Sequence, residues 1–170
     1  MADGVTVKLE GIDELKRVME QASKTIRTKA VRAALKKAGQ VISKEAKQSA
    51  PVLQVPTKTR KPGTVKKAIA VRTSKFAKQQ GDEGVFVGVR PLRGSRQKKL
   101  GKAGAKNPND PFYWKFLEFG TKKMSARKLS GPNDDGFMRQ AATDKGKEAI
   151  DTFMDQVIPQ IEKLNAKASR

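Results

Sequence analysis

The chain has 170 residues, of which 36% are apolar and 32% charged, so it can form one domain with its own core. It contains neither cysteine nor histidine, which excludes disulfides, thiolate or imidazole metal sites, and the usual Ser-His and Cys-His catalytic pairs. No stretch approaches the roughly 18 apolar residues that span a bilayer, and no signal pattern opens the chain. We therefore expect a soluble single domain (1–170) made in a cytoplasm, with no cofactor and no membrane contact.

The charge is large and unevenly placed. The formal net charge is +20 at pH 7, and between Ala46 and Asn109 sixteen Lys and Arg residues accompany only Asp82 and Glu83. The N-terminal and C-terminal thirds are nearly balanced by comparison. A surface of this sign binds polyanions unless acidic partners neutralise it. The middle of the chain is therefore expected to meet nucleic acid or an acidic protein.

A short strand and two helices are predicted in the N-terminal third. Val5–Leu9 alternates apolar and polar residues, as a strand does. Apolar residues then recur at helical spacing over 12–22, with two acids in the first turn, where the helix dipole favours negative charge. A second apolar stripe over 31–46 predicts a helix, either separate from the first or continuous with it, that ends before Pro51.

The middle of the chain predicts a loop followed by a hairpin. Residues 51–63 hold three prolines and a glycine among polar residues, which is typical of a flexible loop. Residues 65–73 are predicted as a strand, although 64–70 could begin as a helix. Residues 75–84 form polar turn material, and Val85–Val89 is the clearest strand of the chain. The two strands could pair as a hairpin.

Residues 90–110 predict a second loop, which is rich in glycine and carries seven basic residues with no acid before Asp110. It is either a solvated flexible loop or a loop that becomes ordered only against a partner or nucleic acid. In neither case is it expected to join the core. The residues of this loop that are candidates to face DNA or a partner protein are Arg93, Arg96, Lys98, Lys99, Lys102 and Lys106.

The chain's aromatic residues are concentrated, since five of nine fall within 112–119. Asp110 as N-cap, followed by a proline in the first turn, predicts a short helix that ends at Gly120 in a left-handed cap. The apolar spacing over 137–166 predicts a long final helix, kinked at Pro159. The expected fold class is α+β, with a small antiparallel sheet packed against two long helices and with long basic loops.

Little in the sequence supports catalysis, and we expect no enzyme. Asp134 and Asp135 are adjacent carboxylates, but they lie among turn-forming residues. No phosphate-binding glycine loop is present. The aromatic residues have helical spacing, whereas base-stacking modules place their rings on alternating strand positions. The charge therefore supports sequence-independent contact with nucleic acid and nothing supports base reading.

Several short motifs occur in a characteristic order. They are Gly11-Ile12-Asp13-Glu14-Leu15 after the first strand, Ala46-Lys47-Gln48-Ser49-Ala50-Pro51, Gly63 to Val71, Val85-Phe86-Val87-Gly88, the series Tyr113, Phe116, Glu118, Phe119, Gly120 and Thr121, and Gly136-Phe137-Met138-Arg139-Gln140-Ala141. This order resembles the tail-completion, head–tail joining minor tail proteins of long-tailed phages, the lambda-like siphophage neck family. The last motif departs from the family by having Gly136 where proline is common.

The resemblance implies a structural virion protein of the phage neck, assembled in the host cytoplasm. It implies a homo-oligomeric ring, most simply a hexamer, at the top of the tail around the channel that DNA crosses. Its partners would be tail terminator or tail tube proteins, head connector proteins, and DNA contacted without sequence preference. The alternatives are a tail terminator ring at the same end, or a basic protein that binds nucleic acid non-specifically.

Two interpretations of the aromatic cluster remain open at this point. Either Phe112, Phe116 and Phe119 anchor the short helix to the sheet, or some of the rings bury against a neighbouring subunit. Glu118 is either a surface acid or the partner of a basic residue in the adjacent chain. The candidate subunit-interface residues are Tyr113, Trp114, Phe116, Glu118, Phe119, Gly120 and Thr121.

Overall fold

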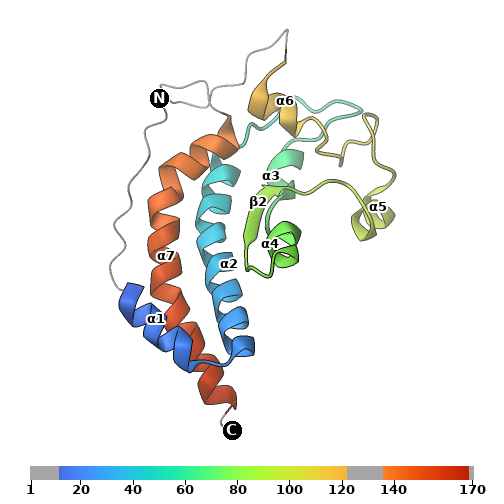
Figure 1. The fold of residues 1–170 in the computed structure, drawn as a ribbon. Helices are drawn as coiled ribbons and strands as arrows, with labels where there is room; N and C mark the ends of the chain where they lie inside the picture. The colour runs from blue at the N-terminus through green and yellow to red at the C-terminus, as the bar shows by residue number, and fades with distance from the viewer. Residues whose placement is uncertain (1–11, 122–135, 169–170) are drawn as a thin grey trace. The chain divides into compact units, whose positions relative to one another are not determined.

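The computed structural model describes residues 12–121 and 136–168 (Figure 1). The predicted strand Val5–Leu9 and the acids Asp134 and Asp135 lie outside these residues. The helices and strands are α1 (Ile12–Gln21), α2 (Lys24–Ser49), α3 (Thr64–Ala68), β1 (Ile69–Thr73), α4 (Lys75–Gln79), β2 (Val85–Val89), α5 (Ser95–Leu100), α6 (Trp114–Phe119) and α7 (Phe137–Ala168).

The chain divides into two compact units, each with its own group of buried residues. The first unit takes its described residues from 12–39, 73–85 and 147–168, and the second from 40–72, 86–121 and 136–146. The single-domain prediction, with flexible loops at 51–63 and 90–110, remains a prediction.

The core of the first unit is built from small residues on α2 and branched residues on α7. Ala30 and Ala34 are fully buried, together with Val157 and Ile161. The apolar stripe of α1 packs against this core through Leu15, Val18 and Met19, as its spacing predicts. Alanine side chains let helix backbones approach closely, which explains why α2 is lean in large apolar residues.

α1 and α2 are separate helices, which settles the alternative that the spacing left open. The break falls at residues 22 and 23. The Ser23 hydroxyl accepts a hydrogen bond from the backbone N–H of Ile26 at 3.4 Å, and the Ser23 carbonyl accepts one from the N–H of Arg27 at 2.9 Å. Ser23 thus occupies the position of an N-cap for α2.

The second unit confirms the fold class. Its core joins the end of α2 (Ala46, Ala50), α3 (Val65, Ala68), the two strands (Ile69, Val89) and the start of α7 (Phe137, Ala141). β1 and β2 form a two-stranded antiparallel sheet. The N–H of Arg90 donates to the carbonyl of Ala68 at 2.8 Å, so that Arg72 lies opposite Phe86 in the ladder. The two long helices therefore pack against a small sheet, as predicted.

Three short helices, α3, α4 and α5, depart from the first prediction for their residues, and α5 is described with the basic segment below. Residues 64–68 form helix α3 before β1 begins, so the helical alternative for this stretch is the correct one. Residues 75–79, predicted as turn material, form helix α4. The hydroxyl of Ser74 accepts a hydrogen bond from the N–H of Ala77 at 3.2 Å, and this N-cap starts a helix that has no apolar periodicity to reveal it.

A bidentate ion pair links α2 to the loop before β2 within the first unit. Nε and Nη2 of Arg32 donate to the two carboxylate oxygens of Glu83 at 2.8 and 2.7 Å. This hydrogen bonding, together with the charge of Arg32, holds the pKa of Glu83 below its ordinary value. It also raises the pKa of Arg32.

We expect this pair to make stability depend on pH in the acid range. A carboxylate whose pKa is lower in the folded state stabilises the fold above its unfolded pKa, and that contribution is lost as the pH falls through the folded pKa. In urea unfolding between pH 6 and pH 3, Glu83→Gln should show a small loss of stability at pH 6 that disappears at pH 3. Glu20→Gln, at an exposed position on α1, is the matched control and should follow the wild type throughout. If the free energy of unfolding of Glu83→Gln changed with pH in the same way as that of the wild type, the expectation would be wrong.

Candidate subunit interface and basic segment

The aromatic segment begins with a turn rather than a helix. Asp110 is buried, and its carboxylate accepts hydrogen bonds from the N–H groups of Phe112 at 3.0 Å and Gly104 at 2.8 Å. The N–H of Trp114 donates to the carbonyl of Pro111 at 2.9 Å, and α6 starts only at Trp114. The prediction that Asp110 caps this helix is therefore wrong, because its carboxylate holds the preceding turn and the basic loop together.

This later start changes which rings face the core. Tyr113, Trp114 and Leu117, at helical spacing, pack against the core of the second unit. Phe116 and Phe119 are 49% and 60% exposed. The interpretation that Phe112, Phe116 and Phe119 anchor the helix to the sheet is thus wrong for the latter two.

Phe112 and Tyr113 form an edge-to-face pair with ring centroids 5.7 Å apart. The guanidinium carbon of Arg60 lies 4.8 Å from the Phe112 centroid and 5.1 Å from that of Tyr113. Burial raises the pKa of Tyr113, and the nearby charge of Arg60 and a hydrogen bond with Thr64 oppose that rise. Tyr113 is therefore placed by contacts within its own unit.

The environment of Glu118 differs most from its sequence-based prediction. The residue is 4% exposed, so the expectation of a surface acid is wrong, while a pairing with a basic residue of a neighbouring chain stays a prediction. Its two carboxylate oxygens accept hydrogen bonds from the N–H groups of Met138 and Arg139, each at 2.9 Å. These N–H groups belong to the first turn of α7, which has no intrahelical acceptor for them. Glu118 therefore caps α7 from α6.

Gly136, the N-terminal neighbour of α7, lies directly beneath this cap. Its carbonyl accepts the first hydrogen bond of the helix from Gln140 at 2.9 Å. A Cβ atom at this position would overlap the backbone oxygen and the carboxyl carbon of Glu118. The departure from the family's usual proline thus coincides with a site that has no room for a side chain.

The exposed part of α6 is a small aromatic surface formed by Phe116 and Phe119. The ring of Phe119 lies 6.4 Å from that of Trp114, and the guanidinium carbon of Arg139 lies 5.6 Å from its centroid. Gly120 ends the helix, as predicted, and donates its N–H to the carbonyl of Phe116 at 3.1 Å. Its φ of 69° is positive, but its ψ of −169° lies outside the left-handed region, so the prediction of a left-handed cap is wrong. Thr121 follows and is exposed.

The basic segment, residues 90–110, contains helix α5 and is held by hydrogen bonds from the side chains of Asn107 and Arg60. Nδ2 of Asn107 donates to the carbonyls of Leu100 and Lys102, both at 2.9 Å, and Nη1 of Arg60 donates to the carbonyl of Ala105 at 2.7 Å. Leu92 is 2% exposed, so the expectation that this segment contributes nothing to the core is wrong for its first turn.

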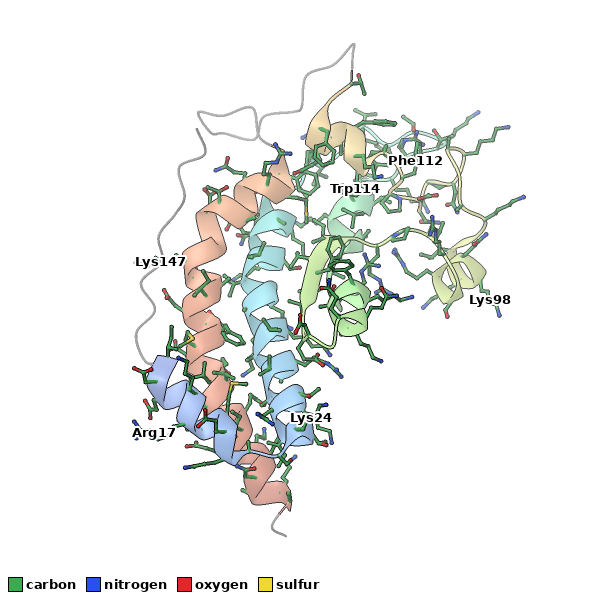
Figure 2. All side chains as sticks on the ribbon, in the orientation of Figure 1. Arg17, Lys24, Lys98, Phe112, Trp114 and Lys147 are labelled. Carbon is green, nitrogen blue, oxygen red and sulfur yellow. The ribbon has the colours of Figure 1, made fainter. Side chains whose placement is uncertain are left out.

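The predicted basic candidates gather on this segment. Figure 2 shows Lys98 on α5, well apart from Phe112 and Trp114. Arg96 is half-buried, and its Nη1 donates to the carbonyl of Arg90 at 2.8 Å. The exposed members are Arg93, Lys98, Lys99, Lys102 and Lys106.

These features define a small α+β protein with an exposed aromatic helix and a basic segment. Within residues 12–121 and 136–168 there is no group of three or more acidic side chains placed to hold a metal ion. None of the described helices combines the length and apolar character needed to cross a bilayer.

The chain belongs to the HK97-gp10-like family, described as "Bacteriophage HK97-gp10, putative tail-component", whose sequence model matches residues 13–120. The protein is therefore a structural component of a bacteriophage tail, and its place is in the virion. No curated protein and no solved structure matches the chain. The matched range includes the aromatic segment and the basic segment and ends at Gly120, the residue that follows α6, so that α7 lies outside it.

Proposed function

We propose that the protein is a neck subunit that completes the tail and joins it to the head. In this proposal the subunits close a ring, most simply of six, at the top of the tail around the DNA channel. Its neighbours are tail tube or terminator proteins below and head connector proteins above, and its role is structural rather than catalytic. Membership of a phage tail family and the order of the motifs support this assignment.

The observation that carries the proposal is the exposure of Phe116 and Phe119 on a helix whose other face is fixed. Trp114 and Leu117 hold α6 to the core, Glu118 links it to α7, and the two exposed rings remain beside them. Aromatic residues on a rigid support contribute strongly to interfaces, because they bury much area at a small loss of side-chain entropy. The interface candidates that the structure leaves accessible are thus Phe116, Phe119 and Thr121.

We expect Phe116→Glu to weaken self-association at least tenfold, because it would place a charge in an apolar contact. Sedimentation velocity and electron-microscope images of the purified protein, at low and high salt, measure this directly. Phe76→Glu is the matched control, since Phe76 is 69% exposed on α4 in the first unit. If the two variants self-associated equally well, α6 would not be part of the subunit interface.

Adding the protein to tails assembled without it tests the role itself. Tails of normal length that become competent to bind filled heads support a completion protein. Tails that are too long when the protein is missing would identify a terminator, because a terminator stops growth of the tube. A protein that binds neither tails nor itself, but binds DNA at low salt, would favour the non-specific nucleic-acid-binding alternative.

A further inference from the structure

A hollow of about 370 Å³ opens in the second unit, where the end of β2 leads into the basic segment. We call it the arginine hollow, because four arginines dominate its wall. Arg90, Arg93 and Arg96 follow β2 within one short stretch, and the pairing of β1 with β2 adds Arg72 to them. The lining residues are Arg72, Arg90, Pro91, Arg93, Ser95 and Arg96.

Two of the four guanidinium groups, those of Arg72 and Arg96, are positioned by contacts that do not neutralise their charge. Arg72 lies against the ring of Phe86 at 5.3 Å from its centroid, and its buried Nε has no hydrogen-bond partner among the described residues. Arg96 is fixed by its bond to the carbonyl of Arg90. Within residues 12–121 and 136–168, no ion pair joins any of the four arginines to a carboxylate. Four neighbouring positive charges without an ion-paired carboxylate favour the binding of an anion.

One acid acts on the hollow from outside its wall. Asp110 opposes the lowering of the Arg96 pKa, which arises from burial and then from the neighbouring charge of Arg90. Both carboxylate oxygens of Asp110 already accept backbone N–H groups, from Gly104 and Phe112. It therefore offers Arg96 only partial compensation.

The surroundings favour an extended polyanion over a single carboxylate. No acid occurs between Val85 and Asn109, and the positive charge continues from the hollow along exposed Lys98 and Lys99 of α5 and Lys102 beyond it. Guanidinium forks match phosphate oxygens in pairs, and a row of lysines follows a row of phosphates without reading bases. We propose that the arginine hollow binds a phosphate of the DNA backbone, in a sequence-independent way. The inference rests on the proposed function, which places DNA beside this protein, but the site belongs to one chain.

The test measures binding of a fluorescein-labelled 20-base-pair duplex to the purified protein by anisotropy, over a series of salt concentrations. The hollow variant is Arg90→Gln with Arg93→Gln, both at exposed positions. The matched control is Arg17→Gln with Lys29→Gln, two exposed positions of the first unit that lose the same charge. Circular dichroism confirms that each variant is folded, and sedimentation reports its self-association separately.

We expect the hollow variant to bind the duplex about tenfold or more weakly at 100 mM salt, with the salt slope lower by about 2. The control should stay within about threefold of wild type. Equal losses in both variants would overturn the proposal, because bulk charge alone would explain them. A hollow variant that keeps DNA affinity but no longer binds poly-glutamate would also overturn it and would assign the hollow to an acidic protein. Self-association is measured separately, so the two proposals can fail independently. The DNA measurement tests the arginine hollow, and the formation of rings tests the neck assignment.

Discussion

Replacing Glu118 by alanine should lower the free energy of unfolding by about 2–4 kcal/mol. The change leaves the N–H groups of Met138 and Arg139 without their acceptors, and each lost partner of this kind costs about 1–3 kcal/mol. It also removes a negative charge from the positive end of a helix of 32 residues. Urea unfolding followed by circular dichroism measures the change.

Two further variants sharpen this test. Glu118→Gln keeps the volume but presents an amide N–H to one of the two donors, so we expect an intermediate loss of about 1–2 kcal/mol. Glu20→Ala removes an exposed acid from α1 and should stay within about 0.5 kcal/mol of wild type. If Glu118→Ala were no more destabilising than Glu20→Ala, the carboxylate would not be the cap of α7.

Gly136→Ala and Gly146→Ala should change stability in opposite directions, although both replace a glycine of the same region by the same residue. At Gly136 the new Cβ would overlap the backbone oxygen of Glu118, which cannot move without displacing α6. We expect a loss of about 2–3 kcal/mol, typical of an overpacked site. At Gly146, inside α7, a Cβ meets nothing within 4 Å. Alanine there should add about 0.5–1 kcal/mol through its better helix propensity.

Thermal and urea unfolding of the two variants provide the comparison. Because the substitutions are chemically identical, an effect on the unfolded chain contributes similarly to both and largely cancels. Two variants that shift stability in the same direction by the same amount would show that Gly136 is not sterically confined by Glu118.

The long elements were predictable because their signals are local. α1, α2 and α7 follow from apolar periodicity, β2 follows from its β-branched residues, and the fold class follows from the order of these elements. α4 and α5 were missed because they have five and six residues and no apolar stripe. A serine before a short polar stretch, as at Ser74, was the one signal that could have revealed α4.

The candidate site was predictable in its location but not in the roles of its residues. The concentration of rings pointed to α6, yet a displacement of the helix start to Trp114 decided which rings are buried. The role of Glu118 could not be predicted from spacing, since its partners are backbone groups 20 and 21 residues away. The glycine at 136, where the family often has proline, was the signal that could have drawn attention to this contact. The arginine hollow was hidden for the same reason, because Arg72 and Arg90 meet only through the pairing of β1 with β2.

The contact between Glu118 and α7 also makes the end of one helix depend on another. The N–H groups of Met138 and Arg139 find their acceptors on α6 and not within α7. A local opening of α6 would therefore expose the first donors of α7, so that the two helix ends open together as one cooperative unit.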